Sequence, residues 1–303
     1  MGALSGYFGG KNSMSSWIYS YIPKDIKTYV EVFSGSFAIY FNEDFSQCDN
    51  IIYNDANKWQ TNFMACCKDY NRMLLEIGNS FKPGGFLYCD KTDIIDIKKY
   101  YRDLYTDTKN PNKCDYYDNP NFDMPDYDKG VIYSFMICSA FNSCHARGAG
   151  FSGFSKSNKL KLTTLLNKLN KEEYHKKLEK IDIIENLDFG ELINKYDNDD
   201  VFLYLDPPYK YTDGVGTHDQ DYGSRNIFGD SSHQRLANIL QNCKSRWSLS
   251  YYWFPDLELW FPKDKYVWVS KEFHRPSASF SDNRAKGVEL LIMNYDPKTG
   301  KKL

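Results

Sequence analysis

Apolar and polar positions near the start of the chain predict strands joined by helices. Residues 28–33 (TYVEVF) are β-branched and aromatic, a small-residue turn follows at residues 34–36, and apolar character continues through residues 37–41. This order predicts a strand, a tight turn and a helix. A second short strand is expected at residues 51–53, followed by helical spacing over residues 57–77. Two strands joined by a helix are typical of the start of a parallel sheet.

The same alternation resumes after residue 180. The pattern predicts strands at residues 181–184, 201–205, 247–252, 266–269 and 288–294, with helices at residues 189–195 and 232–244. The last two strands have no obvious helix between them, so we expect them to pair antiparallel.

The middle of the chain follows a different pattern. Residues 82–129 are rich in Asp, Asn, Pro and Tyr and contain one expected helix, at residues 94–105. An apolar helix is predicted at residues 131–141, and a basic helical segment at residues 156–180. We therefore expect an α/β protein with a mostly parallel, seven-stranded sheet. Residues 1–64 and 181–303 would form its main domain, and residues 65–180 would be an inserted, mainly helical domain.

Composition narrows the class of protein. The 303 residues are 42% hydrophobic, which excludes a mostly disordered chain, and 38 Lys and Arg against 40 Asp and Glu give a net charge of −2. A polyanionic partner would therefore have to meet a local basic surface. The eight Cys are scattered and neither they nor the five His show the paired spacing of a zinc site, so no metal is expected. With no long apolar run, we expect a soluble, cytoplasmic protein.

The tetrapeptide Asp206-Pro207-Pro208-Tyr209 directly follows the buried strand at residues 201–205. Two prolines stiffen the backbone and remove two N–H donors, which leaves carbonyl oxygens and the Asp206 carboxylate as acceptors. Such a site suits a neutral group with two N–H donors, and Tyr209 offers a ring on which that group could stack. The exocyclic amine of a nucleobase fits, although a plain turn after the strand is the simpler alternative.

Two further features lie at expected strand ends. The turn Ser34-Gly35-Ser36 follows the first strand, where small residues let a ligand approach the backbone closely, and Asp55 follows the second. An acid at that place commonly binds the ribose hydroxyls of a nucleoside cofactor. A plain loop and a helix N-cap are the structural alternatives.

These motifs, together with residues 7–11 (YFGGK), resemble the DNA adenine-N6 methyltransferases of the Dam type over most of the chain. The resemblance implies a Rossmann-like methyltransferase sheet with an antiparallel final strand and an inserted target-recognition domain. It implies S-adenosylmethionine as the methyl donor and double-stranded DNA as the partner. The cofactor-binding residues it implies are Tyr7, Lys11, Phe33, Gly35, Ser36, Asp55, Asp188, Phe189 and Asp206.

The resemblance also implies a mechanism. Asp206 and Pro207 would accept the two N–H groups of a flipped-out adenine, Tyr209 would stack on its ring, and Pro208 would complete the rigid catalytic motif. Methyl transfer would then be direct, without a covalent enzyme intermediate or a metal.

For DNA recognition, residues 140–155 resemble the family's hairpin that enters the major groove. Phe141 and Asn142 precede Arg147, which would read a guanine or clamp a phosphate, and these alternatives stay open. Lys156 and Lys159 begin a lysine-rich stretch that would contact phosphates or form a solvated helix face. The sequence leaves the oligomeric state open between a monomer and a weak dimer.

Two other functions remain in view. The same fold could act on another amino acceptor, such as cytosine N4 or an RNA adenine. It could also be a catalytically silent DNA-binding protein, a reading suggested by Phe37, which stands where the family frequently has a small residue.

Overall fold

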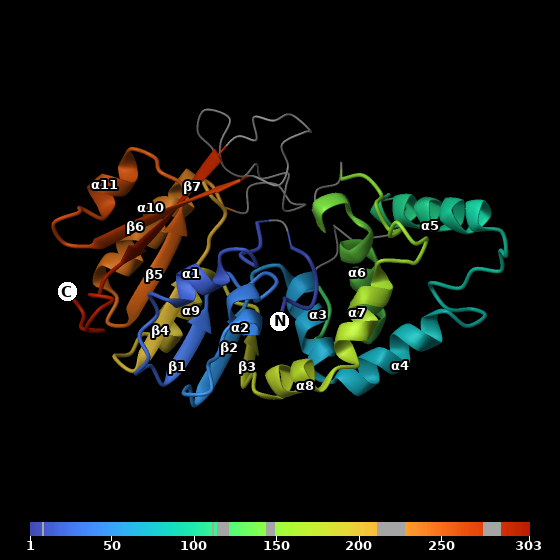
Figure 1. The fold of residues 1–303 in the computed structure, drawn as a ribbon, viewed down its shortest axis with the longest axis horizontal. Helices are drawn as coiled ribbons and strands as arrows, with labels where there is room; N and C mark the ends of the chain where they lie inside the picture. The colour runs from blue at the N-terminus through green and yellow to red at the C-terminus, as the bar shows by residue number, and fades with distance from the viewer. Residues whose placement is uncertain (8, 111, 114–120, 144–148, 211–227, 275–285) are drawn as a thin grey trace.

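A seven-stranded sheet forms the centre of the protein. The computed structural model describes residues 1–303 other than 8, 111, 114–120, 144–148, 211–227 and 275–285 (Figure 1). The strand order is β3-β2-β1-β4-β5-β7-β6. The strands are β1 (Thr28–Glu31), β2 (Asn50–Asn54), β3 (Ile183–Glu185), β4 (Val201–Leu205), β5 (Arg246–Tyr251), β6 (Val267–His274) and β7 (Lys286–Met293).

The direction of the strands agrees with the prediction. Strands β3, β2, β1, β4 and β5 pair in parallel, whereas β7 pairs antiparallel with both β5 and β6. The final strand therefore lies between β5 and β6 and runs against the rest of the sheet. This arrangement confirms the expected Rossmann-like sheet with an antiparallel final strand.

Alternate side chains of each central strand enter different cores. Tyr29 and Phe202 belong to one buried cluster, while their chain neighbours Val30 and Leu203 belong to the other. This alternation follows from the two-residue repeat of a strand and explains why β1 and β4 read as nearly continuous apolar runs.

Helices cover both faces of the sheet. The first cluster contains side chains of α1 (Ser15–Tyr19) and α2 (Ala38–Asn42). The second contains side chains of α9 (Phe189–Tyr196), α10 (Asp230–Asn242) and α11 (Asp256–Trp260).

The remaining helices belong to the central part of the chain. They are α3 (Lys58–Lys68), α4 (Tyr70–Ser80), α5 (Ile94–Lys109), α6 (Tyr127–Ser139), the short 3₁₀ helix η1 (Phe141–Ser143), α7 (Leu162–Leu169) and α8 (Glu172–Glu179). Figure 1 shows α4, α5, α6 and α7 at one end of the molecule and the sheet at the other. The predicted boundary between residues 64 and 65 falls inside α3, and the two-domain division stays a prediction.

Two segments that were each predicted as one helix form two helices instead. The helix expected over residues 57–77 is interrupted at Asp69, whose carboxylate accepts the backbone N–H of Arg72 at 3.1 Å and caps a new helix, α4. The basic segment of residues 156–180 likewise forms two short helices, α7 and α8, separated by Asn170 and Lys171.

Candidate active site

The carboxyl ends of the parallel strands bring the predicted residues to one edge of the sheet. Glu31, near the end of β1, lies in register with Tyr53 of β2 and Tyr204 of β4. The turn at residues 34–36, Asp55 and Asp206 each follow one of these strands within a few residues. This is the edge at which open α/β sheets bind ligands.

At the end of β4, Asp206 is held by a lysine from the N-terminal segment. The Nζ of Lys11 lies 2.8 Å from Asp206 Oδ1 and 3.7 Å from Glu289 Oε1. It also lies 4.9 Å from the centre of the Tyr209 ring. The Tyr209 hydroxyl in turn donates a hydrogen bond to Glu289. Four side chains from three distant parts of the sequence thus form one buried cluster.

The charges of this cluster depend on one another. Burial lowers the pKa of Lys11, but the carboxylates of Asp206 and Glu289 raise it more, so the ammonium is retained. Burial and the nearby charge of Asp206 raise the pKa of Glu289 to about 7, although Lys11 opposes this shift. The cluster is therefore a paired cation beside two carboxylates and not a set of independent surface charges.

Aromatic rings surround Tyr209. The ring of Tyr252 meets it edge-on with 4.5 Å between centroids, and Tyr251 lies 5.4 Å away. Tyr252 is itself stacked with Phe273 of β6 at 6.2 Å. These rings form an apolar wall beside the Asp206 carboxylate.

The turn after β1 is shaped by Gly35, which has a φ of +47°. A Cβ at this position would lie 2.9 Å from ring atoms of Tyr7, so the N-terminal segment covers the turn directly. The carbonyl oxygen of Gly35 accepts hydrogen bonds from the Tyr53 hydroxyl at 3.0 Å and the Gln60 amide at 2.6 Å. The turn is therefore fixed from three sides.

Asp55 caps the same turn. Its Oδ2 accepts the backbone N–H of Gly35 at 2.8 Å, and its Oδ1 accepts the N–H of Asn57 at 2.8 Å. Burial raises the pKa of Asp55 to about 6 against the effect of these two donors. The helix N-cap that was the alternative role for Asp55 belongs to Asn57, whose side chain accepts the N–H of Trp59 and Gln60.

Phe37 does not lie in the crevice. It is fully buried, begins α2 in a left-handed conformation with φ 56°, and packs against Tyr40, Phe41 and Tyr53. The ring therefore enters the core beneath the turn and leaves the turn's outer face clear.

Asp188 and Phe189 lie at the start of α9. The ring of Phe189 is 5.7 Å from Phe33 and 5.4 Å from Phe228. The carboxylate of Asp188 accepts the N–H of Gly190 and pairs with Arg235 at 2.5 Å, which carries the guanidinium to 4.0 Å from the Phe189 ring centre. Burial raises the pKa of Asp188, but Arg235 and the backbone N–H of Gly190 together lower it more, and the net pKa is below its usual value.

The predicted DNA-binding residues lie beyond α6. Phe141 is 60% exposed, and Asn142 adopts a left-handed conformation with φ 53° in η1. The backbone N–H of Phe141 donates to Gly150 at 2.9 Å, so the chain returns on itself here as a hairpin does. Lys156 and Lys159 are exposed on the turn that precedes α7. Arg147 lies outside the described residues.

The N-terminal segment links these regions. Gly6 abuts Ser143 of η1, because a Cβ on Gly6 would lie 2.2 Å from the Ser143 hydroxyl oxygen. The same segment then brings Tyr7 to Gly35 and Lys11 to Asp206. One short stretch therefore touches the expected DNA hairpin, the turn expected to bind the cofactor and the expected catalytic motif.

Sequence reasoning missed three residues of this site, namely Glu289, Tyr252 and Arg235. Glu289 carried a usable signal, since it is a lone acid within the apolar run of β7. Arg235 and Tyr252 carried none, because their roles arise from contacts with residues far away in the chain.

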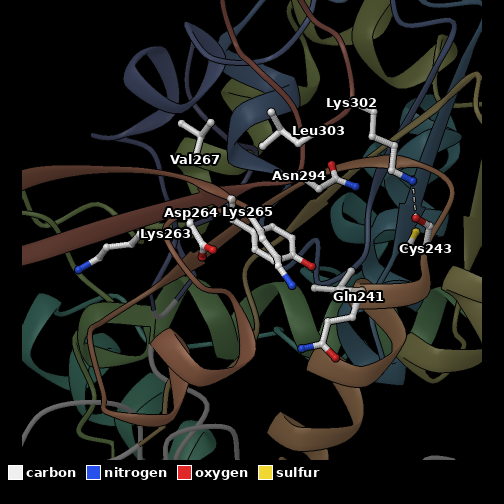
Figure 2. Close-up of a pocket in the computed structure, with 11 residues that line it drawn as sticks. Gln241, Cys243, Lys263, Asp264, Lys265, Val267, Asn294, Lys302 and Leu303 are labelled. Atoms are coloured by element: carbon white, nitrogen blue, oxygen red, sulfur yellow. Dashed lines mark hydrogen bonds between the residues drawn. The ribbon is translucent and has the colours of Figure 1, made fainter.

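Other parts of the described structure lie away from this edge. A hollow of about 650 Å³ lies between α10, the start of β6 and residues 302–303, at the amino edge of the parallel strands (Figure 2). Among the described residues, no three His, Cys, Asp or Glu side chains cluster as metal ligands would. Within the same residues, every helix is too short or too polar to cross a membrane.

The fold and the strand-end motifs define a methyltransferase of the Rossmann-like class. The family model of the D12 class N6 adenine-specific DNA methyltransferases matches residues 7–279. The chain belongs to this family, which confirms the resemblance and the enzyme class expected from the sequence.

Curated relatives support the same assignment. The chain is 24% identical over 311 residues to modification methylase StsI of Streptococcus sanguinis, covering 97% of this chain and 43% of that protein. It is 26% identical over 239 residues to the type II methyltransferase M.CviBI of Paramecium bursaria Chlorella virus NC1A, with 78% of each covered. It is also 26% identical over 309 residues to the type II methyltransferase M.MjaIII of Methanocaldococcus jannaschii, covering 95% and 96%. The chain thus spans less than half the length of StsI.

Proposed function

We propose that this protein transfers a methyl group from S-adenosylmethionine to N6 of a flipped-out adenine in double-stranded DNA. The observation that carries the proposal is the Asp206 carboxylate at the rigid end of β4. It is 17% exposed and is paired with the buried Lys11 ammonium, which also lies over the ring of Tyr209. The Asp206 carboxylate thus already accepts hydrogen bonds from an amino group, that of Lys11, as it would from the adenine amine.

The turn after β1 fits the cofactor. Among the described residues, the Ser36 hydroxyl is buried without a hydrogen-bond partner, which is the state of a polar group that a ligand completes. Each oxygen of the Asp55 carboxylate accepts one backbone N–H and keeps a second lone pair for a ribose hydroxyl. Phe33 and Phe189 form an apolar surface for an adenine ring.

The cofactor-binding set therefore comprises residues from five segments of the chain. Tyr7 and Lys11 lie in the first segment; Phe33, Gly35 and Ser36 in the second; Asp55 in the third; Asp188 and Phe189 in the fourth; and Asp206 in the fifth. S-adenosylmethionine supplies, when bound, a methyl group on a positively charged sulfur.

The catalytic role of the chain is to hold the acceptor nitrogen. The N6 lone pair of adenine is delocalised into the ring and is a poor nucleophile, so orientation matters more than activation. Asp206 and the Pro207 carbonyl accept its two N–H groups, Pro208 stiffens the motif, and Tyr209 stacks on the base. Flipping the base costs a few kcal/mol, which this stacking partly offsets.

DNA binding uses the surface beyond α6. Phe141, which is exposed, and Asn142 directly follow α6, and the exposed Lys156 and Lys159 add positive charge before α7. Arg147 would read a guanine or clamp a phosphate. Lysine contacts to phosphates would give binding a steep salt dependence.

Labelled methyl transfer tests the proposal. The protein is incubated with [methyl-³H]S-adenosylmethionine and DNA from a methylation-deficient host, and the nucleosides are separated after digestion. We expect label in N6-methyladenine, and Asp206→Ala should lower kcat at least about a thousandfold. Asp264→Ala, an exposed position at the opposite edge of the sheet, is the matched control.

The alternatives predict different results. Label in N4-methylcytosine, or transfer to RNA alone, would replace the proposed acceptor. Tight DNA binding without any transfer would favour a catalytically silent DNA-binding protein.

A further inference from the structure

Glu289 is a buried acid within the apolar run of β7. It is 2% exposed and lies on β7, in register with Lys271 of β6. Its carboxylate accepts the Tyr209 hydroxyl and lies 3.7 Å from the Lys11 ammonium. Burying a carboxylate is unfavourable. The backbone pairing of β7 does not need a carboxyl side chain, so the contacts of Glu289 with Tyr209 and Lys11 point to a role at the pocket.

We propose that Glu289 is a positioning residue that fixes the Tyr209 ring and receives the Lys11 ammonium when the target amine takes the Asp206 carboxylate. The inference rests on the proposed function. Glu289 acts through Lys11 and Tyr209 and does not itself touch the substrate.

The position of Lys11 creates the need for a second carboxylate. Its Nζ forms an ion pair of 2.8 Å with Asp206 Oδ1 and lies over the ring of Tyr209. These are the acceptor and the aromatic face that the flipped base requires, so the ammonium and the target amine compete for one place. Lys11 has to leave Asp206 before the base can dock.

Glu289 is the partner to which Lys11 can move. Its Oε1 is already within 4 Å of the ammonium, and both side chains are shielded from water, with exposures of 10% and 3%. Without this carboxylate, a displaced ammonium would be buried without a counter-charge, which is strongly unfavourable. The same carboxylate keeps the Tyr209 hydroxyl in place, so the stacking face does not rotate while Lys11 moves.

The test compares Glu289→Gln with Glu272→Gln, an exposed glutamate on the neighbouring strand β6 that gives the same charge change. The amide retains an oxygen for the Tyr209 hydroxyl but offers Lys11 no charge. We expect Glu289→Gln to lower kcat for labelled methyl transfer about tenfold, since a buried partner of a charged group is lost. The KM for S-adenosylmethionine and the Kd for DNA should stay within about twofold, because docking of the base follows both binding events.

A second comparison isolates the lysine. In a Lys11→Met background there is no ammonium to move, so Glu289→Gln should lower kcat by less than about threefold. A merely structural role predicts the same loss in both backgrounds, and that result would overturn the proposal. Equal kcat values for Glu289→Gln and Glu272→Gln would overturn it as well.

Two further outcomes are informative. If Glu289→Gln does not fold, Tyr209→Phe removes the same hydrogen bond from the other side, and an unchanged kcat in that variant would reject the positioning of the ring. If the wild-type protein transfers no methyl group to DNA, the proposed function fails and the role of Glu289 fails with it. Wild-type transfer with an unaffected Glu289→Gln variant rejects the role of Glu289 alone.

Discussion

The Asp55 carboxylate accepts the backbone N–H of Gly35 at 2.8 Å and so ties the end of β2 to the turn after β1. The two residues are 20 positions apart, and the contact is buried. It makes the shape of the turn depend on one side chain of the neighbouring strand.

Replacing Asp55 by Asn should disrupt this turn. The amide presents one acceptor to two N–H donors, so one donor loses its partner at a cost of about 1–3 kcal/mol. We expect S-adenosylmethionine to bind at least about tenfold more weakly, as measured by calorimetry. Asp182→Asn is the matched control, because Asp182 accepts the N–H of Ile51 at 2.7 Å at the other end of β2. Equal losses of affinity in the two variants would contradict a specific role for Asp55.

Replacing Gly35 by Ala tests whether the turn tolerates a Cβ. The φ of +47° disfavours alanine, and the new atom would lie 2.9 Å from the Tyr7 ring. Gly84→Ala is the control, since Gly84 also has a positive φ, of 87°, but nothing lies within 4 Å. Both variants should lose about 1 kcal/mol of stability. Only Gly35→Ala should weaken S-adenosylmethionine binding, and a similar affinity in both proteins would show that Tyr7 moves aside at no cost.

Arg235→Ala should weaken cofactor binding about fivefold, because the Phe189 ring loses the guanidinium that lies 4.0 Å from its centre. The change also leaves Asp188 without its cation and raises its pKa. Arg246→Ala breaks the ion pair of 2.7 Å with Asp25 and serves as the control. Fluorescence titration with S-adenosylmethionine distinguishes the two. An unchanged Kd in Arg235→Ala would remove Arg235 from the site.

Glu31 should make stability depend on pH. Burial raises its pKa to about 8 from an ordinary 4.5, although the Tyr29 hydroxyl and the Tyr40 N–H oppose the shift. The folded protein therefore holds the proton more tightly than the unfolded chain, and stability falls as pH rises from about 4.5 to about 8. Glu31→Gln should gain about 4 kcal/mol relative to wild type between pH 5 and pH 9.

Urea unfolding across this pH range measures the difference. Glu191→Gln, an exposed position on α9, should give a curve parallel to that of the wild-type protein. A Glu31→Gln curve that is also parallel to wild type would show that the carboxyl group is not held protonated.

The sheet was predictable because its strands have a simple pattern. The run VFLYL ends at Leu205 in both prediction and structure, and the turn at Gly35 and the acid at Asp55 follow their strands as expected. The helix break at Asp69 was not predicted, because helical spacing continues across it and only the capping carboxylate ends α3 and starts α4. The spacing of apolar residues carries no information about such a cap.

The site was predictable only in part for a related reason. Asp206 and Tyr209 were predictable because they flank two adjacent prolines in a recognisable motif. The position of Lys11 was not, because it depends on contacts with residues far away in the chain. The sequence suggested that Lys11 borders the cofactor, and the structure brings its ammonium to the Asp206 carboxylate. The concern raised by Phe37 was likewise answered only by the direction of its ring.

The contact between Lys11 and Glu289 joins the first segment of the chain to its last strand. Contacts of such long separation form late, since the intervening chain has to be ordered first. Regain of methyl transfer should therefore lag behind regain of helical signal when the denatured protein refolds. A fragment lacking either partner could build much of the sheet and still have an incomplete pocket.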